Sequence, residues 1–291
     1  MDPRDEPNLD PRAILDSLGF RGPAAIVPVS GGTDTTIWRV RQANTSYALR
    51  VFRAEQAATC AKEVTVMRAA RAGGVPVPAV QAVGSWHDYP ALLLSWCPGR
   101  TFVQALQKQP WTIWRLGVLA GRTQARIHAV AAPPALQQAS PSWFAWAGPA
   151  EQALRSRLQT LSLRPAALLH LDYHPLNIMT DGRRITGVLD WANAGAGEPR
   201  ADLARTIAIL RLAPLGRFST SPPVEVLRRL LVLSWQTGYQ QSAGPVGDLT
   251  LFYAWAGATT ARDLTGKVAP ATIARIHRWT ALQKRKAGVA G

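Results

Sequence analysis

The pattern of apolar and polar positions changes about a third of the way along the chain. Up to Trp96, short runs rich in β-branched and aromatic residues alternate with turn residues, which is typical of strands joined by turns. One short helix is expected between the Asp10-Pro11 start signal and Gly19, and a longer one at 57–72. The sequence therefore predicts a small, mainly antiparallel sheet with one long helix, and its strands are expected at 24–29, 35–41, 47–53, 79–86 and 91–96.

The pattern after residue 97 is mostly helical. Cys97-Pro98-Gly99-Arg100 indicates a hinge, because proline and glycine interrupt regular structure there. One pair of strands, at 177–180 and 184–189, flanks Asp181-Gly182, a dipeptide that favours a tight hairpin turn. The predicted helices cover 101–107, 111–130, 149–161, 201–212, 223–239, 247–263 and 270–284. We therefore predict an α+β protein with a β-rich lobe at 1–97, a helical lobe at 98–291 and ligands bound between them.

Composition narrows the class of protein. Hydrophobic residues make up 47% of the chain and charged residues 18%, which is a globular balance. Cys60 and Cys97, the two cysteines, are too few and too far apart in sequence for a disulfide framework or a zinc site. The acidic, polar N-terminus differs from a signal peptide, and no apolar run is long enough to cross a bilayer. We expect a cytoplasmic protein that is not bound to a membrane, and the sequence does not indicate its oligomeric state.

Net charge raises the question of a polyanionic partner. The formal charge of +15 and the pI of about 11.1 make nucleic acid a candidate. However, the excess is nearly all arginine, and it is scattered along the chain without a run of five or six like charges. Such a distribution does not form the stripe that follows a phosphate backbone. Nucleic-acid binding therefore stays a less favoured alternative.

The chemically most informative segment leads into the predicted hairpin. It has the pattern His-x-Asp-x4-Asn from His170 to Asn177, and the hairpin ends at Asp190-Trp191. Phosphoryl transfer needs an oriented hydroxyl and metal ions that neutralise phosphate charge. One carboxylate at the acceptor, with a carboxamide and a second carboxylate on magnesium, is a sufficient set. Asp172, Asn177 and Asp190 supply that set, and the competing interpretation is a surface turn that contains Asp and Asn.

These motifs, followed by Gly197-Glu198-Pro199-Arg200-Ala201-Asp202, resemble in order the signatures of the aminoglycoside phosphotransferase family. That family includes macrolide and choline kinases and shares the protein-kinase fold. The resemblance extends over nearly the whole chain. It implies that Asp172 is the catalytic base, that Asn177 and Asp190 bind Mg²⁺, and that ATP or GTP is the donor. It also implies structural roles for His170 and for a buried Asp202 that braces the loop.

The resemblance is less sharp before the hinge. Ser30, Gly31, Gly32 and Thr33, followed by Asp34, resemble the family's nucleotide-phosphate loop, in which glycines let backbone N–H groups approach phosphate. The P-loop pattern GxxxxGK[ST] does not occur in the sequence. The strand at 47–53 resembles the one that carries the family's phosphate-binding lysine, but it has arginine instead.

That arginine is Arg50, which is always charged and can bind phosphate bidentately, although its longer planar head changes the geometry. Glu63 on the following helix is its expected partner, unless both are ordinary surface charges. The segment 91–98 resembles the hinge strand, where backbone groups of Ser95 and Cys97 would contact the purine. His128, near the end of the predicted helix 111–130, is interpreted as a packed or capping residue.

The acceptor is the least defined part of the prediction. A polycationic aminoglycoside requires carboxylates around it, but acidic residues are sparse after the hinge. Tryptophans are plentiful there, and they serve either as core or as part of a pocket. A neutral, sugar-bearing or macrolide-like acceptor fits this balance better than a polycation.

We therefore predict a Mg²⁺-dependent phosphotransferase that moves the γ-phosphate of ATP or GTP to a small-molecule hydroxyl, of an antibiotic or of a metabolite. The alternative within the same fold is a catalytically idle nucleotide-binding protein. A protein kinase is disfavoured, because only eleven residues separate Asp190 from Asp202, too few for a long activation segment.

Overall fold

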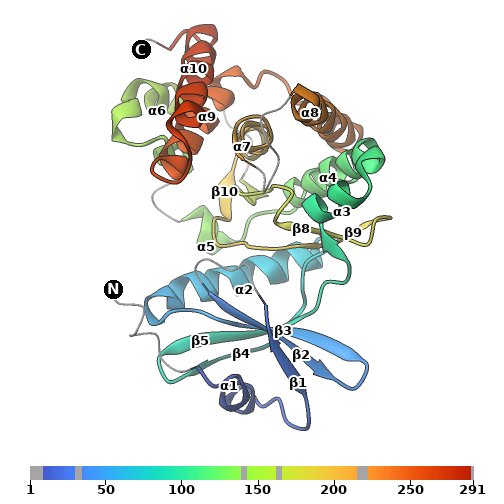
Figure 1. Cartoon of the computed structure of the whole chain (residues 1–291). Helices are drawn as coiled ribbons and strands as arrows, with labels where there is room; N and C mark the ends of the chain where they lie inside the picture. Colours follow the sequence, from blue (N-terminus) through green and yellow to red (C-terminus); the bar gives the residue numbers. More distant parts are fainter. Residues whose placement is uncertain (1–8, 30–34, 139–142, 162–165, 215–221, 290–291) are drawn as a thin grey trace. The chain divides into compact units, whose positions relative to one another are not determined.

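The chain folds as two compact units in the computed structural model, which describes residues 9–29, 35–138, 143–161, 166–214 and 222–289. One unit consists of Met1–Arg68 with Pro78–Cys97, and the other of Ala69–Val77 with Pro98–Gly291. The succession of strands and then helices along the chain can be followed by colour in Figure 1.

The first unit is built on a five-stranded antiparallel sheet in the order β1-β2-β3-β5-β4. All five strands predicted from the sequence are confirmed, with ends that differ by a few residues. The expected turn at 42–46 is shorter, because Gln42 pairs with Thr45 and Ala43 adopts a φ of +50°. The strands are β1 (Ala25–Pro28), β2 (Thr36–Gln42), β3 (Thr45–Val51), β4 (Val80–Trp86) and β5 (Tyr89–Ser95).

Two helices accompany this sheet, as predicted. α1 (Pro11–Ser17) begins where the Asp10 carboxylate accepts a hydrogen bond from the Arg12 N–H, and it ends before Gly19, whose φ is +73°. The buried side chains of α1 join those of the sheet in one core, which contains Ile14, Leu15, Val40, Leu49 and Leu93. α2 (Ala57–Ala72) has the predicted bounds and is followed by Gly73-Gly74.

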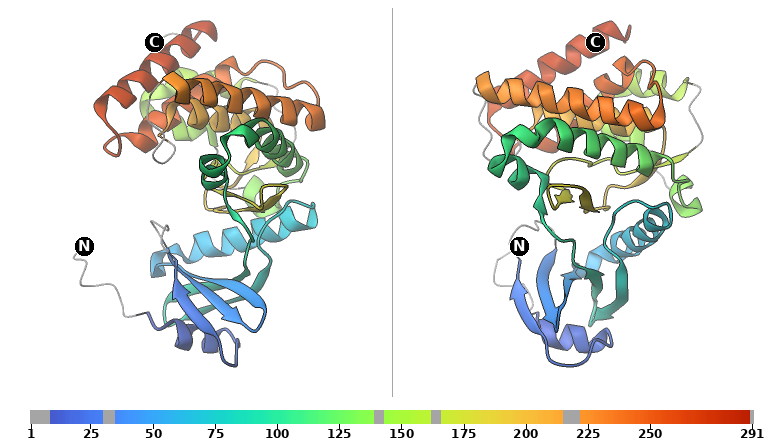
Figure 2. Two further views of the ribbon diagram at one scale, coloured as in Figure 1. Left: turned by 45° about the vertical axis from the view of Figure 1, so that its right-hand side comes forward. Right: turned by 90° about the vertical axis from the view of Figure 1, so that its right-hand side faces the viewer.

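The second unit is mainly helical. α4 and α8 lie side by side along their length (Figure 2). Gly121 and Gly238 permit this contact, since an added Cβ would lie 2.0 Å from the Trp235 carbonyl oxygen or 2.1 Å from that of Val118. Its helices are α3 (Phe102–Lys108), α4 (Ile113–His128), α5 (Pro134–Gln137), α6 (Gln152–Gln159), α7 (Pro199–Leu212), α8 (Pro222–Ala243), α9 (Thr250–Leu264) and α10 (Pro270–Lys286).

The tryptophans of this unit divide between core and surface. Trp143 and Trp255 meet edge to face with ring centroids 4.9 Å apart, inside a core formed by α6, α7, α9 and α10. Trp235 is also fully buried. In contrast, Trp111 is 75% exposed and Trp114 44% exposed. Helical spacing alone did not distinguish these two groups.

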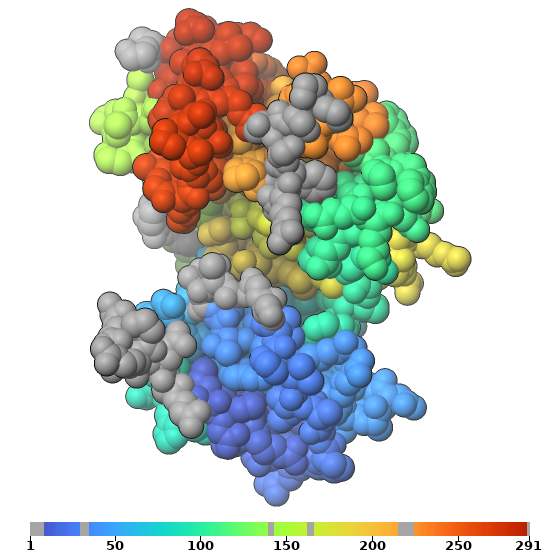
Figure 3. All heavy atoms as spheres, viewed as in Figure 1, coloured from blue at the N-terminus to red at the C-terminus, as the bar shows by residue number. Residues whose placement is uncertain are grey.

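Two small sheets interrupt the helices. The predicted hairpin is present as β8 (Ile178–Thr180) and β9 (Ile185–Val188), joined to β6 (Arg100–Thr101). Its turn is longer than the expected tight turn, because the Asp181 carboxylate accepts from the N–H groups of Arg183 and Arg184. The tip projects from the surface in Figure 3. The second sheet, β7 (Ala167–Leu169) with β10 (Gly195–Gly197), was not predicted, because three-residue strands show no clear periodicity.

Within the described residues, no helix combines the length and the apolar character that a bilayer span requires.

Candidate active site

The loop that follows β7 carries the predicted catalytic residues. It runs from His170 to Asn177 and continues directly into β8. Leu171 in this loop has a φ of +61°, a left-handed conformation that costs free energy for a residue with a side chain. The surrounding structure must therefore hold the backbone in place at this point.

One face of α7 holds this backbone. The fully buried carboxylate of Asp202 accepts hydrogen bonds from the N–H groups of His170, at 2.9 Å, and Leu171, at 2.8 Å. Three residues further along the helix, Arg205 donates from Nε to the Leu171 carbonyl at 2.9 Å. Thr206, at the next position, donates to a loop carbonyl two residues later. Because positions i, i+3 and i+4 share a helix face, a single helix fixes the loop through three side chains.

Sequence reasoning identified Asp202 in this group but missed Arg205 and Thr206. The i, i+3, i+4 spacing of the polar residues within the otherwise apolar stretch 201–210 could have indicated them. Burial of Asp202 opposes its ionisation, but hydrogen bonds from His128 and the loop, with the nearby histidine charges, lower the pKa of Asp202. It is therefore a carboxylate at neutral pH.

His128 is part of the same support. It is buried at the end of α4, with Nε2 2.9 Å from an Asp202 carboxylate oxygen and Nδ1 2.7 Å from the Tyr239 hydroxyl. The interpretation of His128 as a packed residue is confirmed. Its connection to Asp202 was not foreseen, because the two residues lie 74 positions apart.

His170 connects the loop to the end of β9. Its Nε2 donates to the Leu189 carbonyl at 3.0 Å, and its Nδ1 accepts from the Asp172 N–H at 3.3 Å. The ring is fully buried, and this burial lowers the pKa of His170, against the opposing effect of nearby carboxylates. A neutral ring with the proton on Nε2 satisfies both contacts.

Asp172 and Asn177 lie in direct contact. The Asn177 amide donates from Nδ2 to the backbone carbonyl of Asp172 at 3.0 Å and to its carboxylate at 3.2 Å. With the NH₂ group committed to these acceptors, the amide oxygen of Asn177 is directed elsewhere. The backbone carbonyl of Asn177 accepts a hydrogen bond from the Leu189 N–H at 2.8 Å. This bond connects the loop to the residue before Asp190.

Asp190 is the residue after Leu189, whose N–H forms that backbone bond. It is exposed, and its φ of +60° places it in the left-handed region, which Asp adopts more readily than most residues. The hydrogen bonds around Leu189 therefore bring three predicted residues, Asp172, Asn177 and Asp190, to one end of the hairpin.

Asp172 is ionised at neutral pH. Burial acts to raise its pKa, but the hydrogen bond and charge of His174, with contributions from Arg205 and His170, outweigh burial and lower the pKa of Asp172 to about 2. The nearest of these groups is His174, whose Nε2 lies 3.5 Å from the carboxylate.

The donor set suits magnesium. Asn177 offers an amide oxygen and Asp190 a carboxylate, and Mg²⁺ prefers such hard oxygen ligands while it keeps water or phosphate oxygens in its remaining positions. Among the described residues, no group of three His, Cys, Asp or Glu side chains could hold a metal ion. A magnesium ion at Asn177 and Asp190 would therefore need further ligands such as nucleotide phosphate.

The first unit contains the second group of predicted residues. Arg50 on β3 and Glu63 on α2 form an ion pair with 2.7 Å between Nη1 and Oε2. Glu63 is fully buried and the Arg50 side chain is 15% exposed, so the pair is not an ordinary surface contact. Arg50 also donates from Nε to Thr35 and stacks its guanidinium 4.6 Å from the centre of the Phe52 ring.

The remaining predicted nucleotide contacts are less defined. Ser30, Gly31, Gly32 and Thr33 lie outside the described residues. The Ser95 N–H donates to the Ala79 carbonyl at 2.8 Å, and the Ser95 hydroxyl accepts from the Ala79 N–H. The N–H and hydroxyl groups of Ser95 therefore form hydrogen bonds within the first unit. Cys97 is buried at the end of this unit.

Comparison with known proteins places this architecture in a family. The sequence model of the phosphotransferase enzyme family matches residues 25–221. No curated protein matches the chain by sequence. One similar solved structure is a thermostable variant of aminoglycoside phosphotransferase APH(4)-Ia, in ternary complex with AMP-PNP and hygromycin B. It has a TM-score of 0.64 and 14% identity, over 94% of this chain and 97% of that one.

Two further structures share the fold. Spectinomycin phosphotransferase APH(9)-Ia, in complex with ADP and spectinomycin, has a TM-score of 0.52 and 13% identity, over 88% of this chain and 87% of that one. The apoenzyme of macrolide 2'-phosphotransferase MphH from Brachybacterium faecium has a TM-score of 0.50 and 16% identity, over 88% of this chain and 92% of that one.

At these identities the similarity to solved structures shows the fold alone, and it confirms the predicted α+β, protein-kinase-like architecture. The family match covers more than half of the chain and includes the loop that carries Asp172. This protein therefore belongs to the phosphotransferase enzyme family.

Proposed function

We propose that this protein transfers the γ-phosphate of ATP or GTP to a hydroxyl group of a small molecule, in a reaction that requires Mg²⁺. The observation that carries this proposal is the arrangement of Asp172 and Asn177, whose side chains are 3.2 Å apart, with Asp190 directly after the residue that bonds to Asn177. An ionised carboxylate for the acceptor thus lies beside two oxygen donors for a metal.

Asp172 acts on the acceptor. Its carboxylate accepts a hydrogen bond from the acceptor hydroxyl and directs the oxygen toward the phosphorus. As the new O–P bond forms and the bond to the leaving nucleoside diphosphate breaks, the hydroxyl proton passes to Asp172. A carboxylate with a pKa of about 2 is a weak base, so orientation is its main contribution, in agreement with a loose transition state that needs little base strength.

Asn177 and Asp190 would hold magnesium, which neutralises charge on the transferred phosphoryl group and on the leaving phosphate. The backbone bond between the Leu189 N–H and the Asn177 carbonyl limits the separation of these two donors. His170 also holds Leu189, because its Nε2 donates to the Leu189 carbonyl. The chain thereby provides a preorganised site, which is how proteins accelerate phosphoryl transfer.

The nucleotide is assigned to residues 1–97 and the catalytic loop to residues 98–291. In the first region Arg50 contacts the phosphates, and Glu63 holds the guanidinium in place. Ser30, Gly31, Gly32 and Thr33 supply backbone N–H groups, and the backbone of Ser95 and Cys97 approaches the base. That similar structures contain AMP-PNP or ADP supports a nucleotide donor.

The acceptor is a hydroxyl-bearing antibiotic or a metabolite. Similar structures contain hygromycin B or spectinomycin, which makes antibiotic inactivation, and thus resistance, one proposed role. The second candidate is a catalytically idle nucleotide-binding protein. The replacement of a lysine by Arg50 is the observation that favours it, because the planar guanidinium changes the phosphate contact.

Nucleotide consumption separates these two candidates. The assay measures ADP or GDP release with Mg²⁺ and a panel of aminoglycosides, macrolides, nucleosides, sugars and amino alcohols. In parallel, the melting temperature is recorded with ATP and Mg²⁺. We expect acceptor-dependent release from the wild type, and a melting shift that Asp190→Asn removes. Asp16→Asn, which changes an exposed acid on α1, serves as the control. A melting shift without turnover of any acceptor would support the idle protein instead.

A further inference from the structure

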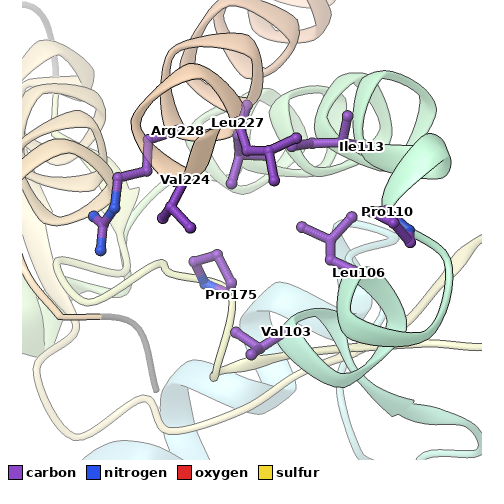
Figure 4. A pocket seen from close by; sticks show the side chains of 9 residues that line it. Val103, Leu106, Pro110, Ile113, Pro175, Val224, Leu227 and Arg228 are labelled. Atoms are coloured by element: carbon purple, nitrogen blue, oxygen red, sulfur yellow. The ribbon is translucent and has the colours of Figure 1, made fainter. Parts of the chain in front are cut away.

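A nearly uniform apolar pocket lies beside the catalytic loop (Figure 4). About 510 Å³ of space not occupied by atoms lies within it, and this figure includes open solvent at its mouth. Residues from α3, α4, α8, the turn before α4 and the catalytic loop form its wall. The lining residues are Val103, Leu106, Pro110, Ile113, Pro175, Val224, Leu227, Arg228 and Leu231.

Pro175 makes this pocket part of the catalytic region. It follows Asp172 by three residues in the loop and lines the pocket directly. Its carbonyl also accepts a hydrogen bond from the Val103 N–H at 3.3 Å, so that the start of α3 is attached to the loop. A molecule in the pocket would therefore contact the segment that positions the catalytic carboxylate.

The pocket offers no site for an ammonium group. Of the nine lining residues, eight are apolar, none is acidic and one, Arg228, is cationic. Arg228 lines the wall with its stem, and Figure 4 shows its guanidinium directed away from the other lining side chains. Its Nη1 donates to the Leu210 carbonyl at 2.7 Å. Burial and then the charge of Arg275 lower the pKa of Arg228. A second cation here would lose its hydration and meet like charge.

Exposed apolar side chains flank the lining residues. Trp111 is the chain neighbour of Pro110 and is 75% exposed, while Trp114 follows Ile113 and is 44% exposed. Val226, next to Leu227 on α8, is 64% exposed. These three side chains do not line the pocket themselves, and its apolar wall is formed by the residues named above.

We propose that this pocket binds an uncharged hydrocarbon portion of the phosphoryl acceptor, so that the acceptor is a hydroxyl compound with an apolar part and not a polyamine sugar. This inference rests on the proposed phosphotransferase function for the identity of the molecule as an acceptor. The pocket itself makes a binding prediction that does not need turnover.

A series of alkyl glucosides provides the test, because the sugar hydroxyls stay constant while the hydrocarbon grows. Binding of methyl, butyl, hexyl and octyl glucoside to the full chain is measured calorimetrically, without nucleotide and below the micelle-forming concentration. We expect one saturable site, with affinity that rises up to about fourfold per added methylene until the pocket is filled. 6-Aminohexyl glucoside, the cationic counterpart of hexyl glucoside, is expected to lose this gain.

A matched pair of variants on α8 locates the site. Leu227→Asn places a polar group in the pocket wall, and Leu233→Asn makes the same change at an exposed, non-lining position of the same helix. The chain-length dependence is expected to flatten in the first variant and to persist in the second. Leu227→Ala, a milder change, replaces Leu227→Asn if circular dichroism shows that the latter is unfolded.

Two results would overturn the inference: an affinity that does not depend on chain length, or an equal gain for the aminohexyl compound. An unchanged gain in both Leu227 variants would also overturn it. The outcome is separable from that of the proposed function. In Asp172→Asn, alkyl glucosides are expected to bind with the wild-type chain-length dependence although phosphoryl transfer is lost. Binding that depends on chain length, without turnover of any acceptor of the panel by the wild type, would therefore reject the function but not the pocket.

Discussion

His128 and Asp202 form a buried contact of 2.9 Å between the imidazole Nε2 and a carboxylate oxygen. The same carboxylate accepts the two N–H groups that begin the catalytic loop, including that of Leu171 in its left-handed conformation. His128 therefore acts on the loop through Asp202, without a role of its own in the chemistry.

Removal of His128 should loosen the loop and destabilise the fold. We expect His128→Ala to lower the free energy of unfolding by about 1–3 kcal/mol, because a buried carboxylate loses a donor. It should also lower kcat more than it changes the KM for nucleotide. Tyr239→Phe, which removes only the hydroxyl behind the ring, should cost less, about 1 kcal/mol. Urea unfolding and steady-state kinetics test this, and equal effects of both variants would contradict the proposed order.

The buried His170 makes stability depend on pH. Its pKa is lowered in the folded protein, so below the ordinary value of about 6.5 the unfolded chain binds a proton that the native ring does not. The contribution of the neutral His170 ring to the free energy of unfolding is fully present above pH 6.5. It is lost as the pH falls below that value, at up to about 1.4 kcal/mol per pH unit. Urea unfolding between pH 7.5 and 5 should show this slope.

Two histidine variants test whether His170 causes the pH dependence of stability. His170→Gln should reduce the slope between pH 6.5 and 5, whereas His277→Gln, which changes an exposed histidine of α10, should retain the wild-type slope. An unchanged slope in His170→Gln would show that this ring does not carry the effect.

The stability of the fold should depend on the Arg50 guanidinium, which pairs with Glu63. Arg50→Met leaves the fully buried Glu63 without that ion pair, and we expect a loss of about 3–5 kcal/mol in the free energy of unfolding. Arg50→Lys keeps a cation and should cost less. Arg41→Met, at an exposed position of β2, is the control and should lie within about 0.5 kcal/mol of the wild type. A similar loss in the Met and Lys variants would contradict the importance of the charge.

The contact between α4 and α8 depends on glycine. In Gly121→Ala the added Cβ would lie 2.0 Å from a backbone oxygen, which cannot be relieved by a rotamer change. We expect a loss of about 1–3 kcal/mol or more in the free energy of unfolding from this overpacking. Gly195→Ala, where the nearest atom is 3.4 Å away in a side chain, should cost much less. Thermal unfolding of the two variants tests the difference.

Local patterns predicted the elements of this fold well, but not the contacts between them. The alternation of strand-like runs with turn residues in the first unit indicated all five strands. The bounds of α2 were correct because Gly73-Gly74 ends the helical run. β7 and β10 were missed, since three residues are too short to show a period.

The candidate site shows the same limit. Asp172 and Asn177 are five positions apart in one loop, so a local motif indicated that they act together. The contact of His128 with Asp202 spans 74 positions and that with Tyr239 spans 111. Such pairs form only when α4, α7 and α8 pack, and no local pattern specifies that packing.

The most direct test of the central claim is the rate of phosphoryl transfer by Asp172→Asn to an acceptor that the wild type phosphorylates. The substitution keeps the size of the side chain and removes its charge. We expect the rate to fall by about 10²–10⁴-fold while the affinity for nucleotide changes little, with Asp16→Asn at the wild-type rate. A variant that transfers phosphate at the wild-type rate would contradict the assignment of Asp172.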